Sequence, residues 1–311
     1  MRYFLFLTLF FSPFLGLSKA RKDTILTGVY VKSIHDLQPI DFSYGIDFYL
    51  WLSSIKDTVS FEKVEIINSK QIEKFHSEHD TDNGFIISSQ NCKGRIHHSW
   101  YLLNYPFDHQ RLHIKVELSD DTSKAVLIQD KRGFIIDELL VIPGWRIVNH
   151  FAKDTIHTYS SDFGCHKMYK GKSSYSSIIY EIEIVRDSWG LFFKLFSGLY
   201  IAFLVSFISF FVKSVHIDPK IGLCIGALFA AVANNYIVNS NIPASSDFSL
   251  VDKLHILTFF YIFIALVISV RSDYHIQNNN LIKSIRLNKY AKLVFVFSYI
   301  FLNVYFIYSA K

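Results

Sequence analysis

Residues 21–188 contain short runs in which hydrophobic and polar positions alternate. In the clearest run, Leu112–Leu118, apolar residues occupy every second position between His, Lys and Glu. Ile46–Leu52 and Tyr180–Ile184 repeat this period of two, which is typical of strands with one buried face. Shorter apolar runs separated by turn residues occur at 29–31, 85–87, 125–128, 134–136 and 146–148. Many short strands without a long helical pattern predict an antiparallel β-sandwich.

Residues 189–311 have a different pattern, with four long apolar runs. The runs cover 191–212, 221–238, 254–270 and 293–308. Each is close to the ~20 residues that a helix needs to cross ~30 Å of hydrocarbon. They are not core helices of a soluble protein, because too little other chain remains to cover them. We therefore predict four membrane-spanning helices, at about 189–212, 219–240, 250–271 and 288–309.

The first 20 residues have the pattern of a signal peptide. Arg2 gives a positive start, 4–17 form an apolar core, and the Ser-Lys-Ala sequence at 18–20 resembles a cleavage site. The alternative is a membrane anchor, but the apolar run is shorter than the ~20 residues of a span. Cleavage would leave a mature chain that begins near Arg21, and the strand domain at 21–188 would be exported.

Basic residues are unevenly distributed among the links between the predicted helices. Those in the first and third links are Lys213, Lys220, Arg271, Lys283, Arg286 and Lys289. The second link, 241–249, has no Lys or Arg. Basic links tend to stay in the cytoplasm, which agrees with an exported N-terminal domain and places the C-terminus outside. The chain is predicted to be a multi-pass protein of the cell membrane, the inner membrane in a Gram-negative cell.

Composition narrows the possible functions only a little. The 311 residues are 50% hydrophobic and carry a formal net charge of +5. No run of Lys and Arg is long enough to indicate nucleic-acid binding. Cys92 and Cys165, in the predicted exported part, either form a disulfide or remain free. No Ser-His-Asp, paired-acid or zinc pattern indicates an enzyme, and nothing implies a cofactor.

The second predicted helix, 219–240, is unusually rich in small residues. At ~100° per residue, a stripe about 80° wide runs along it and the residues just before it. The stripe consists of Asp218, Gly222, Gly226, Phe229, Ala233, Tyr236 and Ser240. Such a row either lines a water-filled pore or lets helices approach closely. Both interpretations hold in a ring of helices, and the stripe alone does not separate them.

Asp218 favours the pore interpretation. With Pro219 after it, Asp218 is also a good N-terminal cap for the helix. In a ring of helices, it would form a circle of carboxylates that favours cations. Lys220 lies on the opposite side of the helix and does not cancel this charge. Asn235 also points away from the stripe, either as a satisfied buried amide or as a hydrogen-bond partner of a neighbouring helix.

Four short motifs occur in a fixed order around these elements. They are Tyr105-Pro106-Phe107-Asp108 before a strand, Gly144-Trp145, Arg186 before the first helix, and Asn241-Ile242-Pro243 after the second. This order, with four helices, resembles the pentameric ligand-gated ion channels, in particular bacterial members without the loop disulfide. The resemblance covers nearly the whole mature chain. It implies an immunoglobulin-like sandwich of about ten strands and a four-helix bundle in a homopentamer.

The resemblance also implies roles for individual residues. Counted back from Pro243, Asp218 takes the place of the inner acidic residue of cation-selective members. Phe229 takes the place of a hydrophobic gate. The residues expected to couple the strand domain to the pore are Asp36, Asp108, Arg186 and Pro243, with Asp108 and Arg186 as an ion pair. The alternative, an ordinary surface bridge, would contribute only ~0–1 kcal/mol.

The ligand is less well defined by the sequence. The family binds cationic amines with aromatic residues, and the residues in the matching stretch are Tyr159, Tyr169 and Tyr175. Tyrosines in a strand domain more often serve packing. Protons are another candidate agonist, because the 13 histidines titrate near neutrality. His97-His98 near Cys92 also resembles a metal site, although such clusters are mostly solvated turns.

Several departures from the family affect one wall of its usual ligand pocket. An upstream Trp-x-Pro-Asp segment is absent, the stretch 51–105 is short, and Gly222 and Gly226 replace the usual Thr or Ser. We expect a subunit of a homopentameric, cation-conducting ligand-gated channel. The alternative is a non-conducting, membrane-anchored receptor with the same fold. Its partners would be further copies of itself, membrane lipids, permeating cations and a small-molecule or proton agonist.

Overall fold

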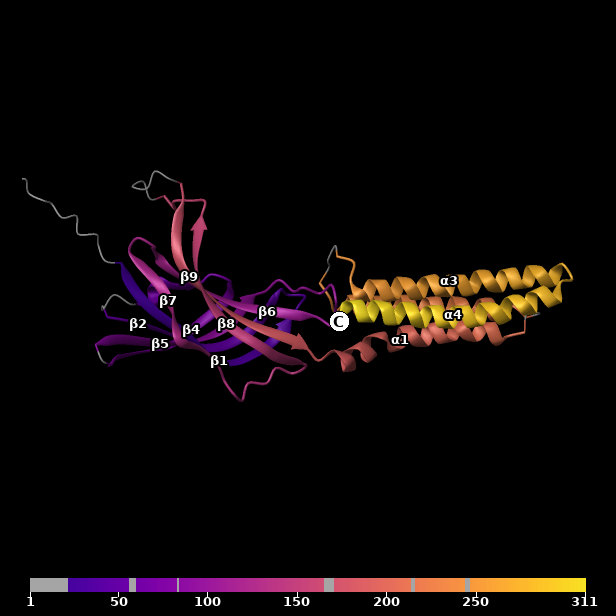
Figure 1. Ribbon diagram of the computed structural model, residues 1–311, viewed down its shortest axis with the longest axis horizontal. Helices are drawn as coiled ribbons and strands as arrows, with labels where there is room; N and C mark the ends of the chain where they lie inside the picture. Colours follow the sequence, from indigo (N-terminus) through magenta and orange to yellow (C-terminus); the bar gives the residue numbers. More distant parts are fainter. Residues whose placement is uncertain (1–21, 56–59, 83, 165–170, 214–215, 244–246) are drawn as a thin grey trace, which may run out of the picture.

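The computed structural model describes residues 22–311 except 56–59, 83, 165–170, 214–215 and 244–246. In this part, a region of strands precedes four long helices, and the two lie end to end (Figure 1). The predicted order, strands before membrane helices, is confirmed. The predicted signal peptide at 1–20, together with Cys165 and Tyr169, lies outside the described residues.

The strand region contains two sheets. Its strands are β1 (Asp23–Gln38), β2 (Ser43–Ser54), β3 (Val64–Ile66), β4 (Ser69–Asp82), β5 (Phe85–His97), β6 (His109–Asp121), β7 (Ala125–Ile136), β8 (Trp145–Tyr159) and β9 (Ser173–Arg186). One sheet has the order β4-β5-β2-β1-β7 and the other β3-β6-β9-β8. Neighbouring strands are antiparallel, except that β1 and β7 are parallel.

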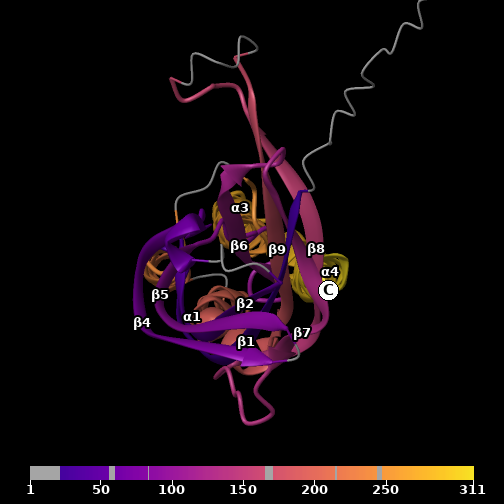
Figure 2. The ribbon, with the colours of Figure 1, turned by 90° about the vertical axis from the view of Figure 1, so that its left-hand side faces the viewer.

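Side chains from both sheets meet in one hydrophobic core. Along β6, Leu112 and Ile114 are fully buried, whereas Arg111, directly before Leu112, is exposed. Tyr180 of β9 and Phe48 of β2 belong to the same buried cluster. This is the one-sided burial that a period of two predicts, and it makes the region sandwich-like (Figure 2).

The four helices are long and apolar enough to cross a membrane. They are α1 (Ser188–Ile208), which continues into the 3-10 turn η2 (Ser209–Phe211), α2 (Ile217–Asn239), α3 (Leu250–Gln277) and α4 (Leu281–Ala310). The predicted ranges are too short for the last two, because α3 continues beyond 271 and α4 begins before 288. Both extensions contain charged and polar residues that interrupt the apolar run, so hydropathy alone does not reveal them.

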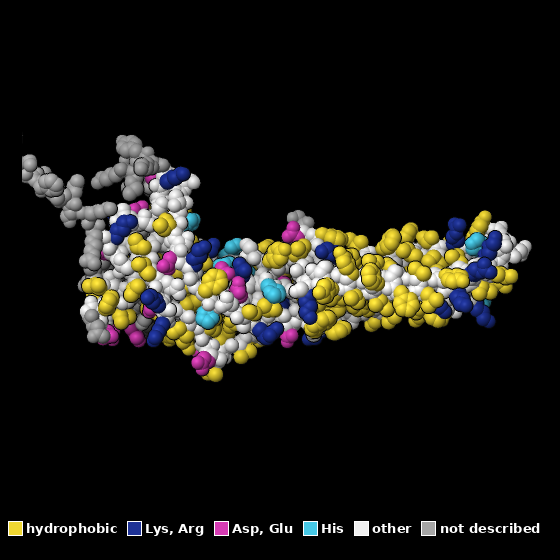
Figure 3. Space-filling model, in the orientation of Figure 1, with side chains coloured by type: hydrophobic (Ala, Val, Ile, Leu, Met, Phe, Trp, Pro, Cys, Tyr) yellow, Lys and Arg dark blue, Asp and Glu magenta, His cyan; other side chains and the backbone are white. Residues whose placement is uncertain are grey.

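Exposed apolar side chains cover the outside of the helices (Figure 3). Examples are Phe260, Phe263, Phe297, Phe301 and Val304. Soluble monomers rarely expose so large an apolar surface, so the chain is a multi-pass membrane protein by this criterion also. Between the helices, the ring of Phe203 in α1 stacks on Tyr299 of α4 with 3.6 Å between centroids.

The strand region, the α2–α3 link and the C-terminus meet at one end of the helices, which we call the junction (Figure 1). There, Leu250 N at the start of α3 donates to Leu103 O (2.9 Å). Lys311 Nζ lies 5.5 Å from the ring centroid of Trp189 in α1. The opposite end carries the α1–α2 and α3–α4 links, and we call it the distal end.

Candidate functional site

Asp108 and Arg186 form a buried ion pair at the junction. Arg186 Nε donates to Asp108 Oδ1 (2.6 Å), and Arg186 Nη2 donates to Oδ2 (3.1 Å). The side chain of Asp108 is 0% exposed and that of Arg186 is 13% exposed. The guanidinium lies over the rings of Tyr105 and Trp145, 5.0 and 4.0 Å from their centroids. A bidentate, enclosed pair of this kind is not an ordinary surface bridge.

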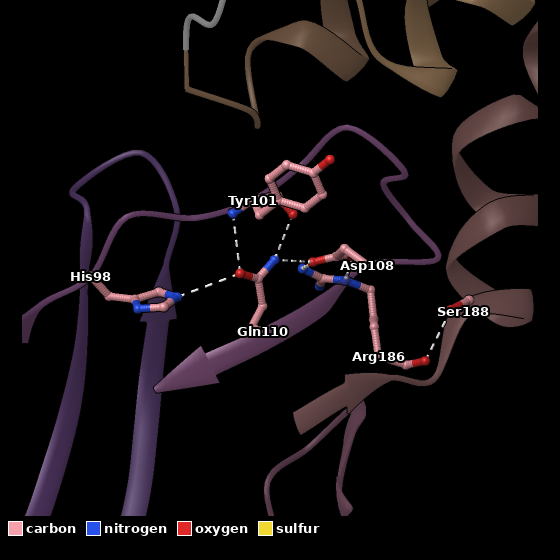
Figure 4. Close-up of polar contacts among 6 residues, drawn as sticks. All are labelled: His98, Tyr101, Asp108, Gln110, Arg186 and Ser188. Atoms are coloured by element: carbon pink, nitrogen blue, oxygen red, sulfur yellow. Dashed lines mark hydrogen bonds and ion pairs between the residues drawn. The ribbon is translucent and has the colours of Figure 1, made fainter. Parts of the chain in front are cut away.

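Gln110 extends this pair into the strand region (Figure 4). Its Nε2 donates to Asp108 Oδ2 (2.8 Å) and Tyr101 O (2.9 Å), and its Oε1 accepts from Tyr101 N (3.1 Å). These partners fix the orientation of the amide, so His98 Nε2, 3.4 Å from Oε1, must be the donor. Burial lowers the pKa of His98 to about 4, which leaves the ring neutral at neutral pH.

The loop 98–108 connects this network to the helices. The ring of Phe107 lies 5.3 Å from that of Trp189 and 5.6 Å from that of Phe192, both in α1. Ser188 Oγ, in the first residue of α1, donates to Arg186 O (2.9 Å). The same loop also accepts the hydrogen bond from the start of α3. A displacement of this loop would therefore act directly on two helices.

Pro243 lies beside this loop, whereas Asp36 does not join the ion pair. Pro243 and Trp100 line the same cavity of about 440 Å³ at the junction. Asp36 is exposed, and its Oδ2 lies 2.9 Å from Nδ1 of the neighbouring His35. Among the described residues, Asp36 therefore pairs with His35 and not with Arg186, and its role in coupling stays a prediction. The role of Pro243 in coupling stays a prediction.

The whole stripe of α2 is exposed in the subunit. Its members Asp218, Gly222, Gly226, Phe229, Ala233, Tyr236 and Ser240 all lie at the surface. Phe229 is 70% exposed and Tyr236 is 77% exposed. A Cβ added at Gly222 or Gly226 would meet no atom within 4 Å. The glycines are therefore not required for helix contacts inside the chain.

The opposite face of α2 packs against the other helices. It consists of Lys220, Cys224, Ala227, Ala231 and Val238. At ~100° per residue, the centre of this buried face lies about 170° from the centre of the stripe. Lys220 is 1% exposed, so it lies away from Asp218.

Asp218 is not the N-terminal cap of α2. The helix begins at Ile217 with His216 as its N-cap residue, so Asp218 lies inside the first turn. The prediction of a cap is wrong because the helix begins earlier than the apolar run. The carboxylate still lies at the positive end of the helix dipole, which stabilises a negative charge.

Asn234, rather than Asn235, links α2 to the neighbouring helices. Its Nδ2 donates to Leu195 O of α1 (3.1 Å), and its Oδ1 lies 3.1 Å from His255 Nε2 of α3. Asn235 Oδ1 instead accepts from Asn239 Nδ2 within α2 (3.0 Å). The pattern of polar positions does not choose between two adjacent amides, because their directions differ only by the rotation of one residue.

Tyr159 and Tyr175 belong to an aromatic cluster on β8 and β9. Their ring centroids are 5.7 Å apart, and Phe163 lies 5.3 Å from Tyr159. The hydroxyl of Tyr159 donates to Glu117 Oε1 (2.7 Å), and His157 Nδ1 lies 2.9 Å from Oε2. Burial and this hydrogen bond raise the pKa of Tyr159 to about 12. The sequence did not indicate Glu117, because it comes from a different strand, β6.

The described residues contain no group of three His, Cys, Asp or Glu side chains that could hold a metal ion. Cys92 is buried with a free thiol, and burial raises its pKa to about 11. His98 is buried and bonded to Gln110. The interpretation of His97-His98 as a solvated turn is therefore wrong for His98.

Comparison with known proteins does not assign the chain to a family. No protein-family model matches the sequence, and no curated protein matches it. The features that bear on function are therefore the buried network at the junction, the exposed stripe of α2 and the aromatic cluster around Glu117.

Proposed function

We propose that the protein is a subunit of a homopentameric, ligand-gated channel that conducts cations. The observation that carries this proposal is the exposed stripe of α2. A membrane helix that faces lipid presents apolar side chains, and intramembrane charges face water or protein. The stripe instead presents a carboxylate, two glycines and a serine on the side opposite to the buried face. A shared water-filled axis accounts for both properties.

The borders of the stripe fit such a ring. Ile225, Val232 and Ile237 are 44%, 50% and 61% exposed. They lie roughly 60–80° from the centre of the stripe, the first two on one side and Ile237 on the other. In a ring, these apolar borders would pack against neighbouring copies, while the stripe between them would face the axis.

Two stripe residues would determine conduction. Asp218 would contribute one carboxylate per copy to a ring at the distal mouth of the pore, which favours cations. Phe229 would contribute to a ring of aromatic side chains that stops ions by excluding water in the closed state. The ammonium group of Lys220 would not oppose this field, because its side chain is buried on the other face.

The strand region would act as the sensor, outside the cytoplasm and with an immunoglobulin-like topology. A cationic amine suits the cluster of Tyr159, Tyr175 and Glu117, where aromatic rings lie beside a carboxylate. Binding there would reach the helices through β6, which begins directly after Asp108, and through β9, which ends at Arg186. The loop between the network and α1 would transmit the displacement to the pore.

The test is current across a planar bilayer that contains the purified protein, in asymmetric potassium chloride, with added amines and with acid. A reversal potential near that of potassium is expected for the unmodified protein. Asp218→Lys should remove or invert this selectivity. Asp273→Lys is the matched control, because it makes the same charge change in α3 near the distal end and outside the stripe.

Unchanged selectivity in Asp218→Lys would overturn the position of the carboxylate ring. A correctly assembled protein without current under every condition would contradict the channel and favour the non-conducting receptor. Equal effects of Asp218→Lys and Asp273→Lys would show a general effect of charge at the distal end, and would also contradict the ring.

A further inference from the structure

A cavity of about 400 Å³ opens at the distal end between the last residues of η2 and the start of α4. Its lining combines aromatic and aliphatic side chains with lysines. It consists of Phe210, Phe211, Val212, Lys213, Leu281, Ile285, Asn288, Lys289 and Lys292. None of these residues is acidic. The proposed pore does not use this cavity, because the cavity lies between η2 and α4 and none of its lining residues belongs to α2.

Among the described residues, the lysines of this cavity form no ion pair with a carboxylate. In the described part of the chain, the lysines that form ion pairs are Lys63, Lys93 and Lys124, all in the strand region. Lys292 Nζ instead lies 4.6 Å from the ring centroid of Phe211. Lys213 and Lys289 are exposed. Three ammonium groups around one opening therefore attract an anion.

The floor of the cavity is held in place by contacts between α3 and α4. Asn288 is 9% exposed, and its Nδ2 donates to Ser272 Oγ (3.0 Å). Ser272 Oγ also lies 2.7 Å from Ser284 Oγ. These bonds hold the turn of α4 that carries Lys289 and Lys292, so the backbone of both lysines is placed at the cavity before any ligand binds.

The apolar part of the lining faces outward. Phe211, Leu281 and Ile285 are 61%, 50% and 56% exposed. Lys and Arg side chains gather at this end of the helices, next to the apolar surface that covers their length (Figure 3). The cavity therefore lies where the head groups of one leaflet meet its acyl chains.

We propose that this cavity binds an anionic phospholipid. Its phosphate would contact the ammonium groups of Lys213, Lys289 and Lys292, and one acyl chain would lie on Phe211 and Ile285. Basic pockets between membrane helices are suited to anionic head groups, and each nearby lysine strengthens the attraction. A zwitterionic lipid would gain less, because its own ammonium group would be repelled. The site does not depend on whether the protein conducts ions.

The test is native mass spectrometry of the full protein, purified in detergent and mixed with phosphatidylglycerol and phosphatidylcholine of the same chain length. The unmodified protein is expected to retain phosphatidylglycerol preferentially. Lys213→Gln/Lys289→Gln/Lys292→Gln should reduce this preference by about tenfold or more. The matched control is Lys131→Gln/Lys153→Gln/Lys172→Gln, which removes the same charge from exposed positions of the strand region.

Equal retention of both lipids by the unmodified protein would overturn the proposal. The same loss of preference in the control would also overturn it, because net charge would then explain the result. If glycerol phosphate at the same concentration as the lipid displaces it, the cavity is a phosphate site in which the acyl chain has no role. That result would also contradict the proposal. Lys289→Gln alone, at an exposed position, should give a smaller loss in the same direction if the triple variant does not assemble.

Discussion

The buried pair of Asp108 and Arg186 should contribute much more to stability than an exposed pair. Arg186→Gln leaves a carboxylate that is 0% exposed without its cation, which costs roughly 3–5 kcal/mol. Lys63→Gln breaks an exposed pair with Asp120 and should cost less than about 1 kcal/mol. Thermal unfolding of the purified proteins in detergent measures both changes.

A second variant separates the charge from the packing of this pair. Asp108→Asn combined with Arg186→Gln leaves no uncompensated buried charge, so it should be more stable than Arg186→Gln alone. Equal losses for Arg186→Gln and Lys63→Gln would contradict a structural role for the buried pair.

Stability should fall with acid because of His98. Its pKa is about 4 in the folded protein, because of burial and the neighbouring His113 and His97, against ~6.5 when unfolded. The unfolded chain therefore takes up the proton first. The contribution of neutral His98 to the free energy of unfolding is complete above about pH 6.5. It is lost as the pH falls to about 4, and the free energy of unfolding decreases by about 3 kcal/mol over this range. His98→Gln should flatten this part of the plot of melting temperature against pH.

His150 supplies the control for this prediction. His150→Gln makes the same substitution at an exposed position of β8, so a change seen only in His98→Gln does not come from the substitution itself. The prediction fails if His98→Gln keeps the slope of the unmodified protein.

Some residues of the candidate site could be predicted from the sequence because they belong to linear motifs. Asp108 and Arg186 are of this kind. Gln110 could also be predicted, because it lies two residues after Asp108 and residues two apart on a strand share a face. Glu117 and Asn234 could not be predicted from the sequence, because their roles depend on contacts with other strands or helices.

At the scale of elements, burial decides which strands the sequence reveals. β2, β6 and β9 each bury one face in the core, and their alternation predicts them. β4 lies at the edge of its sheet, and most of its side chains are exposed. β8 is also an edge strand with mostly exposed side chains. An edge strand that water covers needs no apolar alternation, so hydropathy does not predict β4 and reveals only the start of β8, at 146–148.

Lys220 in α2 should decrease the stability of the packing between helices. It is 1% exposed, and no acceptor among the described residues bonds its Nζ. Lys220→Met keeps a long side chain and removes the unpaired charge, so it should stabilise the protein by roughly 1–3 kcal/mol. The melting temperature in detergent measures this. Lys283→Met, at an exposed position of α4, should have little effect, and a loss of stability in Lys220→Met would contradict the argument.

For the whole molecule, the sequence predicted the order of the two regions and the number of helices, because both depend on hydropathy over long windows. The position of the C-terminus beside Trp189 depends on how α4 packs, and no local pattern encodes it. The charges of the links give a testable prediction of sidedness.

Added cysteines can test this sidedness in a Cys165→Ser background, in which the remaining Cys92 and Cys224 are buried. A membrane-impermeant maleimide should label Lys131→Cys, in the strand region, on intact spheroplasts. Arg286→Cys, near the distal end, should react only after the membrane is permeabilised. The reverse pattern would contradict the proposed topology and would place the strand region in the cytoplasm.

The order of strands along the chain also determines when the strand region can fold during synthesis. β1 pairs with β7, and β6 pairs with β9, the last strand of the region. Only Asp187 separates β9 from α1. The ribosome must therefore begin to release the first membrane helix before the sheets can close. Until then the edge of β6 that pairs with β9 has no hydrogen-bond partner, so a chaperone that binds the nascent chain during this interval should decrease its aggregation.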